Sequence, residues 1–281
     1  MKNDHGDVYI VYRIYPKISK EPIYFTDKES LVSETLRSFR RALGDLKYHI
    51  NFILDNCPTN YESIIYSIFD KSNICINNVI NGGNVGTFII QIDSALANKY
   101  SDIIYFAEDD YYYTDKSLEH GYNHIIQNPE IDFLTLYFNP DYLEHSIHLP
   151  YFDKEVYKRE NWIDVSTTCL TFFARRASLV RAMPHFLTYK KNNYDSSIFL
   201  SLTKLGLFSK LLYWNLLKDM FEGKNEVLKI VAKTFLFGFY QVLLGSRYKL
   251  VSTTKPIATH LQSDRLSPGA DWLEIILRSK T

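Results

Sequence analysis

Short apolar runs alternate, in the first half of the chain, with segments whose apolar residues recur every three or four positions. The apolar runs cover residues 8–14, 49–54, 74–80 and 103–107. Their lengths are those of buried strands. Between the first two runs, Val32, Leu36 and Phe39 fall at helical spacing and give one apolar face. This alternation predicts an α/β protein with a doubly wound, mostly parallel sheet flanked by helices.

Capping signals mark the ends of several predicted helices. The pattern Thr-x-x-Glu, which satisfies free N–H groups at a helix start, begins at Thr26 and again at Thr59. Gly44 stands where the first helix should end, since glycine readily adopts the left-handed conformation found there. The third helix is expected over residues 87–99, after a glycine-rich loop.

The second half of the chain predicts fewer strands and more helix. Residues 132–138 form an apolar run, and residues 165–176 predict a strand that leads into a helix at 177–183. Another apolar helix is predicted from Asp195 onward. Residues 204–249 predict two amphipathic or wholly apolar helices that are broken near glycine 223.

Composition narrows the classes of function. The 32 basic and 32 acidic side chains balance, so no net field favours a nucleic acid as partner. Cys57, Cys75 and Cys169 are widely spaced, which argues against a disulfide framework or a zinc site. The sequence has neither a signal peptide nor a run of the roughly 20 apolar residues that a bilayer requires. We therefore expect a protein of the reducing cytoplasm.

The most unusual stretch is a run of acidic residues directly after the fourth apolar strand. Glu108, Asp109 and Asp110 follow residues 103–107 and precede three tyrosines. Adjacent carboxylates raise one another's pKa unless a cation lies among them, and Mg²⁺ or Mn²⁺ prefers such oxygen ligands. Ligands of parallel sheets bind beyond the carboxyl ends of the strands. The stretch predicts a metal site for a phosphorylated ligand, with a solvated acidic turn as the alternative.

Two common nucleotide-binding motifs are absent from the sequence. Residues 82–86 read Gly-Gly-Asn-Val-Gly, which matches neither the G-x-G-x-x-G of a dinucleotide fold nor the Gly-Lys-Ser/Thr of a P-loop. Residues 13–18, after the first strand, contain no glycine, whereas a sugar-phosphate nucleotidylyltransferase is expected to carry a glycine-rich phosphate loop there. These observations argue against a dehydrogenase and a P-loop enzyme, and weaken the case for such a nucleotidylyltransferase.

With its four strand–helix units, its Gly-Gly-Asn-x-Gly loop and its Glu-Asp-Asp motif, the chain resembles GT-A-fold glycosyltransferases, particularly bacterial enzymes similar to family 2. The acidic motif resembles their Asp-x-Asp, and more closely the Glu-Asp-Asp variant of N-acetylglucosaminyltransferase I. The resemblance implies a single GT-A-like domain over residues 1–281 with a C-terminal helical insertion. Residues 1–115 would be the half that binds a nucleotide sugar, and residues 116–281 the acceptor half.

By this resemblance, side chains at the strand ends bind the donor. Asp110 would coordinate the divalent ion, Mn²⁺ or Mg²⁺, that bridges the donor diphosphate. Glu108 and Asp109 would support the ion through water or contact the ribose. Asp55, at the end of the second strand, matches the position that holds the uracil or ribose. The other residues expected to bind the nucleotide sugar, in the first place a UDP-sugar, are Tyr12, Arg13, Tyr15 and Asn84.

Asp195 and His260 are the candidates in the second half. Asp195 stands at the head of an apolar helix, where inverting members of the family carry the catalytic base. A helix N-cap is the alternative, and Tyr194 occupies the place where a second acid usually precedes that base. His260 stands where many metal-dependent members supply a second metal ligand, although a lone histidine also serves as a structural hydrogen-bonding residue. Residues 267–272 are expected to form a loop that closes over the donor.

The sequence therefore predicts a metal-dependent, inverting, hexosyltransferase-like enzyme of polysaccharide biosynthesis, which acts on a hydroxyl of a glycan or lipid-linked glycan. One alternative is a catalytically silent nucleotide-sugar- or glycan-binding protein on the same fold, which an assay of donor hydrolysis would separate. Another alternative is a metal-dependent nucleotidyltransferase or phosphohydrolase.

The net charge and the apolar residues of the segment 204–249 indicate where in the cell the protein acts. This segment contains eight basic and three acidic residues, a net charge of +5 that leaves −5 for the remainder. Apolar, aromatic and basic helices of this kind are typical of a peripheral membrane segment, here at the inner face of the membrane. The alternative is a helical pair that packs on the sheet or is buried in a homodimer.

Overall fold

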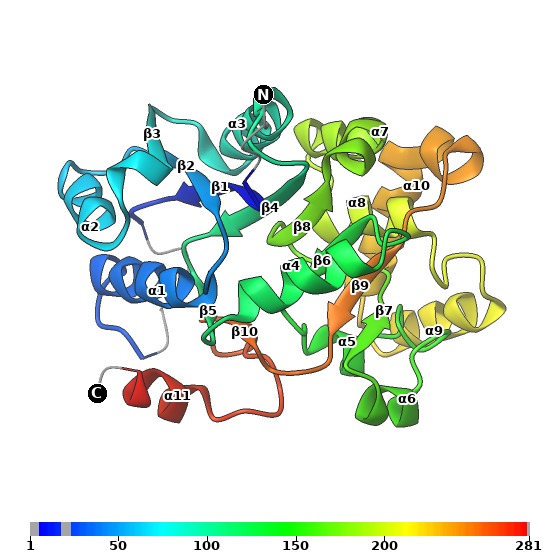
Figure 1. The fold of residues 1–281 in the computed structure, drawn as a ribbon. Coiled ribbons are helices and arrows are strands. Elements are labelled where there is room, and N and C mark those ends of the chain that lie inside the picture. The colour runs from blue at the N-terminus through cyan, green and yellow to red at the C-terminus, as the bar shows by residue number, and fades with distance from the viewer. Residues whose placement is uncertain (1–5, 18–23, 280–281) are drawn as a thin grey trace.

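The computed structural model describes residues 6–17 and 24–279, and it contains the predicted α/β sheet (Figure 1). The eight strands lie in the order β3-β2-β1-β4-β8-β6-β9-β7. They are β1 (Val8–Ile14), β2 (Tyr48–Asp55), β3 (Ile74–Val79), β4 (Ile103–Glu108), β6 (Phe133–Thr135), β7 (Trp162–Asp164), β8 (Phe172–Arg175) and β9 (Leu250–Thr253). The four strands from β3 to β4 are parallel, and so are β6 and β9, whereas β8 and β7 run antiparallel to their neighbours. The predicted fold class, a mostly parallel α/β sheet, is confirmed.

Helices cover both faces of the sheet, as the uninterrupted apolar strands require. In β1, Ile10 and Tyr12 point toward one face and Tyr9 and Val11 toward the other, because successive side chains of a strand alternate. The first face is covered by α1 (Lys28–Ala42), α2 (Asn60–Ile68) and α4 (Ser117–Gln127). The second is covered by α3 (Gly83–Ala97), α7 (Arg176–Phe186) and α8 (Asp195–Thr203). Both faces are closed, which leaves the strand ends for binding.

The predicted helix boundaries hold at some positions and shift at others. α1 is capped by Asp27 and not by Thr26, since the Asp27 carboxylate accepts the Ser30 N–H at 2.7 Å. Gly44 follows the C-terminus of α1 with a left-handed φ of +54°, as predicted. α2 begins after Thr59, whose side chain makes no capping bond. The Thr-x-x-Glu pattern thus located both helix starts to within one residue, although neither threonine caps its helix through its side chain.

The start of α3 lies inside the glycine loop, four residues before the predicted position. The Asp55 carboxylate at the end of β2 accepts the N–H groups of Gly82 at 3.0 Å and of Gly83 at 2.7 Å. The first N–H groups of a helix have no partner within the helix, so an acceptor at this place allows the helix to begin early. A residue from a neighbouring strand supplies it here, which no local pattern around residues 82–86 could reveal.

Only parts of the apolar runs in the second half are strands. Within the run 132–138, only the three residues of β6 form a strand. Within the run 165–176, only the last part forms a strand, β8; most of the earlier residues are buried but do not pair with a neighbouring strand. Two short helices, α5 (Asp141–Glu144) and α6 (Lys154–Arg159), lie between these runs. A second sheet pairs β5 (Tyr111–Tyr113) antiparallel with β10 (Ala258–His260) and joins the acidic stretch to the C-terminal region.

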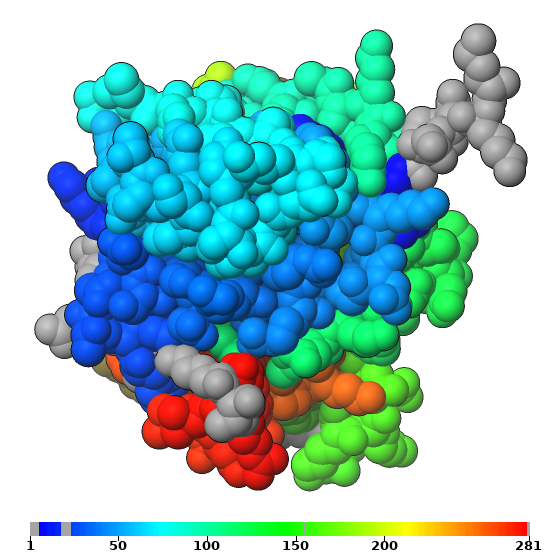
Figure 2. All heavy atoms as spheres, turned by 60° about the vertical axis from the view of Figure 1, so that its left-hand side comes forward, coloured from blue at the N-terminus to red at the C-terminus, as the bar shows by residue number. Residues whose placement is uncertain are grey.

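The C-terminal region contains the two predicted helices and a final packed one. The break between α9 (Lys210–Phe221) and α10 (Glu226–Leu244) includes Gly223, as predicted. The last helix, α11 (Trp272–Arg278), lies in red against the blue surface of the N-terminal region in Figure 2. Trp272 is buried beside Leu31 of α1, and its indole N–H donates to the Ser267 carbonyl at 2.7 Å. Ser267 and Trp272 thus anchor the two ends of the segment 267–272, whereas Gly269 and Asp271 between them are exposed; closure of this loop over a donor stays a prediction.

Candidate active site

The carboxyl ends of β1, β2 and β4 bring polar residues together at one edge of the sheet. Arg13 on β1 lies beside Glu108 on β4 in the parallel ladder, and Asp55 ends the neighbouring β2. These strand ends form a cavity of about 260 Å³, called here the strand-end cavity. It is lined by Arg13, Ile14, Tyr15, Lys17, Lys28, Asp55, Gly83, Asn84, Thr87, Glu108, Asp109 and Asp110. Tyr12 is the one residue predicted to bind the nucleotide sugar that does not line it.

Tyr12 lies in the hydrophobic core. Its side chain is completely buried, and its ring packs against Phe39 and Phe52 with centroid distances of 5.1 and 5.4 Å. Because side chains alternate along β1, the turn of Arg13 into the cavity places Tyr12 on the opposite face, under α1. The prediction that Tyr12 contacts the nucleotide is therefore wrong.

Glu108 lies where the strand-end cavity meets a second cavity. Its carboxylate forms an ion pair with the Arg13 guanidinium and accepts a hydrogen bond from the Thr171 hydroxyl at 3.0 Å. The second cavity has a volume of about 300 Å³ and is called here the Asp195 cavity. It is lined by Glu108, Tyr111, Tyr137, Asn139, Asp141, His145, Ile147, His148, Thr167, Thr168, Cys169, Asp195, Ser196, Glu226, Ile230, His260, Gln262 and Arg265.

Asp110 and His260, the two predicted metal ligands, are in contact although 150 residues separate them. The antiparallel pairing of β5 with β10 brings them together, and His260 Nε2 lies 3.0 Å from Asp110 Oδ2. Burial alone would raise the pKa of Asp110, but His260 lowers it below the usual value. Burial alone would lower the pKa of His260, but Asp110 raises it. Each residue thus favours the charged form of the other.

The same pair has atoms without partners. Asp110 Oδ1 and His260 Nδ1 are buried, and neither has a hydrogen-bond partner among the described residues. A carboxylate oxygen and the nitrogen of a neutral imidazole are suitable ligands for a divalent cation, so the donor set fits the predicted ion once His260 has given up its proton. Within residues 6–17 and 24–279, no group of three or more His, Cys, Asp or Glu side chains is arranged to hold a metal. Water or a bound phosphate could supply further ligands.

Asp109 and Asp55 are both engaged in bonds within the protein. Asp109 is buried, forms an ion pair of 2.8 Å with Lys28 and accepts the Tyr15 N–H at 2.8 Å. Burial lowers the pKa of Lys28, but Asp109 and Asp110 outweigh burial and raise it. Asp55 is buried and holds the glycine loop, as described above. In this structure, therefore, Lys28 presents a positive charge at the cavity, while the two aspartates fix the loops around it.

Asp195 projects from the first turn of α8 into the second cavity. Tyr194 holds the N-cap position and makes no capping bond with its side chain, while Asp195 Oδ1 accepts the Ser196 N–H at 2.7 Å. Burial raises the pKa of Asp195 to about 6, although the Ser196 hydrogen bond lowers it. Asp195 is therefore not the N-cap of α8, and its carboxyl group can exchange a proton near neutral pH.

Sequence reasoning missed most of the residues that surround Asp195. Arg265 forms an ion pair of 2.6 Å with Asp141, and both line the Asp195 cavity. His148 lines it too and is buried, which lowers its pKa to about 3, so it is neutral at pH 7. The Thr168 hydroxyl is buried there without a hydrogen-bond partner among the described residues. None of these residues stands in a local motif, and Lys28 of the first cavity was missed for the same reason.

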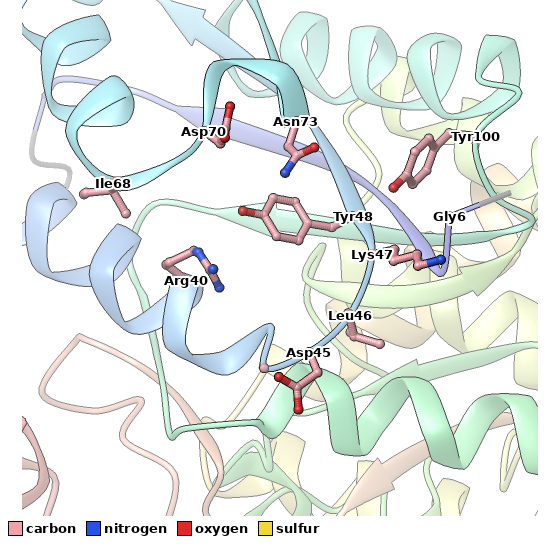
Figure 3. Close-up of a pocket in the computed structure, with 11 residues that line it drawn as sticks. Gly6, Arg40, Asp45, Leu46, Lys47, Tyr48, Ile68, Asp70, Asn73 and Tyr100 are labelled. Atoms are coloured by element: carbon pink, nitrogen blue, oxygen red, sulfur yellow. The ribbon is translucent and has the colours of Figure 1, made fainter. Parts of the chain in front are cut away.

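A larger cavity of about 790 Å³ lies at the opposite edge of the sheet, near the amino ends of β1 to β3 (Figure 3). Arg40, Tyr48, Asp70 and Tyr100 line it, and the Arg40 guanidinium lies 5.6 Å from the centre of the Tyr48 ring. It contains none of the residues at the carboxyl strand ends, where ligands of such sheets bind. We therefore assign the candidate site to the two cavities that meet at Glu108.

Fold and site together describe an α/β protein with a cationic and acidic cavity at the strand ends, joined to a second cavity that contains a carboxyl group of raised pKa. No protein-family model matches the chain, and no curated protein matches it in sequence. A comparison with solved structures returned several matches of low sequence identity, among them nucleotide-sugar transferases, the class that the sequence resembles.

An S. aureus TarS fragment in complex with UDP-GlcNAc matches with a TM-score of 0.44 and 14% identity, over 68% of this chain and 52% of that one. A putative nucleotide-diphospho-sugar transferase from Desulfovibrio desulfuricans matches with a TM-score of 0.40 and 10% identity, over 76% of each chain. A cytidylyltransferase from Leptospira borgpetersenii matches with a TM-score of 0.37 and 12% identity, over 64% of each chain. The chain thus spans about half the length of the TarS fragment. These TM-scores are below 0.5, so the functional argument rests on the arrangement of side chains.

Proposed function

We propose that the protein is a metal-dependent, inverting glycosyltransferase that moves a sugar from a nucleoside-diphosphate donor to a hydroxyl of a glycan or lipid-linked glycan. The observation that carries the proposal is the meeting of the two cavities at Glu108, with the Asp110–His260 pair beside it and Asp195 in the second cavity. A transferase needs one cavity for the donor and one for the acceptor, and the reacting atoms must lie where the two cavities meet.

The strand-end cavity suits the donor. Lys17 and Lys28 are cationic residues of its lining and offer charge to a diphosphate, although Lys28 also forms an ion pair with Asp109, as Arg13 does with Glu108. The first turn of α3, which lines the same cavity at Gly83 and Asn84, adds the positive end of a helix dipole, although the Gly82 and Gly83 N–H groups already donate to Asp55. Tyr15, which is 41% exposed, offers a ring face for a base. These contacts support a nucleotide sugar, with a UDP-sugar as the first donor to test.

The Asp195 cavity suits the acceptor. In the reaction, the acceptor hydroxyl gives its proton to the Asp195 carboxylate while its oxygen forms a bond to the anomeric carbon. The bond from that carbon to the diphosphate oxygen breaks, and the nucleoside diphosphate leaves with the electron pair. Attack from the Asp195 cavity and departure on the side of the strand-end cavity would invert the anomeric centre. General-base assistance of this kind typically contributes about 10²–10⁴-fold.

Asp110 and His260 would hold a divalent cation, which would neutralise the charge that develops on the leaving diphosphate. Their unpartnered buried atoms support this assignment. Glu108, held by Arg13 and Thr171, would keep its carboxylate at the junction and orient the groups around it.

The test is a thermal-shift panel of nucleotide sugars with and without Mn²⁺, followed by product analysis with the donor that binds. A ligand at 100 times its Kd stabilises the native state by roughly 2.7 kcal/mol, so a genuine donor raises Tm measurably. We expect the nucleoside diphosphate as product, in an Mn²⁺-dependent reaction. Release of a sugar phosphate, the leaving group of nucleotidyl transfer from such a donor, would instead identify a nucleotidyltransferase, and binding without turnover a silent nucleotide-sugar-binding protein.

A further inference from the structure

The outward faces of α9 and α10 carry large apolar side chains that nothing in the described structure covers. Figure 1 shows both helices at the end of the molecule opposite α2. Their most exposed apolar side chains are Trp214 at 70%, Phe221 at 92%, Leu236 at 73%, Tyr240 at 74% and Leu244 at 82%. α10 is kinked at Gly238, where φ is −116° and ψ is 22°; Leu236 is exposed before the kink, and Tyr240 and Leu244, four positions apart, lie on one side of the helix after it. A soluble surface rarely exposes so many large apolar side chains close together without a partner.

The opposite face of α10 is fixed to the protein, which determines how the helix can meet a membrane. Within the described residues, α10 is the one helix long and apolar enough to cross a bilayer, with 19 residues and a mean hydropathy of 1.6 over an 18-residue window. However, the Ser197 hydroxyl of α8 donates to the Ile230 carbonyl of α10 at 2.9 Å, and the Thr234 hydroxyl, which donates within α10 to the same carbonyl, lies 3.3 Å from the Ser197 carbonyl. A Cβ on Gly238 would lie 3.3 Å from the Ser201 side chain. α10 thus packs closely on α8 along one side and exposes only the other.

The positive charge of the segment 204–249 favours an anionic membrane over a second copy of the chain as the partner of this surface. Lys210, Lys229 and Arg247 are exposed and form no ion pair within the described part of the chain. They belong to the segment 204–249, whose net charge is +5 on a protein of zero net charge. A symmetric contact between two copies would place this positive segment against itself. An anionic bilayer instead attracts the lysines and arginine while the aromatic and aliphatic side chains enter the headgroup region.

We propose that the outward faces of α9 and α10 dock on an anionic lipid bilayer, with the helices lying in the plane of the interface. α10 also lines the Asp195 cavity through Glu226 and Ile230, so the cavity assigned to the acceptor opens beside the docked helix. This part rests on the proposed function, and it names the acceptor class: a glycan on a lipid anchor in the same membrane. Docking would hold such an acceptor at a high effective concentration near Asp195.

The test is sedimentation of the purified full chain with vesicles of phosphatidylcholine, either alone or mixed with phosphatidylglycerol. We expect binding to the mixed vesicles, weakened by high salt, and little binding to phosphatidylcholine alone. The double variants Trp214→Ser/Phe221→Ser and Leu236→Ser/Tyr240→Ser should bind at least tenfold more weakly, since each removes two exposed rings or chains. Lys229→Glu should weaken binding about fivefold or more. All these side chains are exposed, so the substitutions should not affect folding.

Matched controls lie on other surfaces. Ile126→Ser on α4 removes an exposed apolar side chain, and Lys99→Glu reverses an exposed charge, and both should bind like the unchanged protein. Absence of the unchanged protein from both vesicle pellets would overturn the proposal. Self-association in sedimentation equilibrium that the same double variants abolish, without vesicle binding, would overturn it in favour of a dimer. Mn²⁺-dependent nucleotide binding is measured separately, so failure of the proposed function does not affect the vesicle result.

Discussion

Replacement of Asp195 by asparagine tests the role of this residue in catalysis and the effect of its burial on stability. Asn keeps the size of the side chain and an oxygen that can accept the Ser196 N–H. It cannot accept a proton from the acceptor hydroxyl. We expect turnover to fall by roughly 10²–10⁴-fold, while donor affinity changes little, since a general base acts mainly in the transition state.

The same change has a calculable effect on stability. Burial raises the pKa of Asp195 from 3.8 to about 6, a shift of roughly two units or about 3 kcal/mol at 1.36 kcal/mol per unit. Below pH 4 the carboxyl is protonated in both the folded and the unfolded state, so its burial has no charge-related cost. As pH rises through 6, the unfolded state gains stability by ionising this carboxyl more readily than the folded state, and the free energy of unfolding falls. The loss of a charge at the start of α8 costs only about 0.3–1 kcal/mol, which is smaller.

Asp195→Asn should therefore be more stable than the unchanged protein at pH 7 by up to about 3 kcal/mol, and equally stable near pH 4. For a chain of this size each kcal/mol corresponds to about 2–4 °C in Tm. The measurement is a series of thermal unfolding curves from pH 4 to 8, with Asp93→Asn, an exposed change on α3, as the control. A difference in Tm that does not depend on pH would refute the argument from burial. Normal turnover of Asp195→Asn would refute its role as base.

Further predictions concern the other parts of the site and the packing of the sheet. Asp110→Asn should abolish the Mn²⁺ dependence of nucleotide binding, measured by thermal shift with and without a chelator; unchanged dependence would contradict the assignment. Lys28→Met should weaken nucleoside-diphosphate binding by about tenfold and leave Asp109 buried without its cation, which should lower Tm at pH 7 by several degrees; an unaltered Kd in a calorimetric titration would count against it. Transfer by the unchanged enzyme should rise with pH through about 6 and then level off, because Asp195 must be ionised; a flat pH profile would contradict this. Gly121→Ala should lower stability by about 1–3 kcal/mol, since its Cβ would lie 2.6 Å from Leu136, whereas Gly86→Ala, which meets nothing within 4 Å, should not; equal effects in denaturant unfolding would be the contrary outcome.

Local pattern was sufficient for the first half of the fold. A strand that is buried on both faces requires apolar residues at nearly every position, which is the pattern of the runs 8–14 and 103–107. Nearly all side chains of these two strands are buried in the structure. The carboxylates of Glu108, Asp109 and Asp110 directly follow such a strand, so their place at the edge of the sheet followed from sequence order. Boundaries were less certain, as the start of α3 shows, because a carboxylate from another strand satisfies its first N–H groups.

The sequence by itself determined the order of strands and helices, the acidic strand end, and the presence of two apolar helices within residues 204–249. Only the tertiary structure decided which side chains meet. It brings His260 into direct contact with Asp110, pairs Lys28 with Asp109 and buries Tyr12 in the core. The resemblance to GT-A-fold enzymes, and no local pattern, had assigned Asp110 and His260 to one metal site. The physical reason is the range of the forces involved. Periodicity reports on neighbours within a few positions, whereas the contact between Asp110 and His260 depends on a strand pairing across 150 residues, which the burial of the whole sheet stabilises.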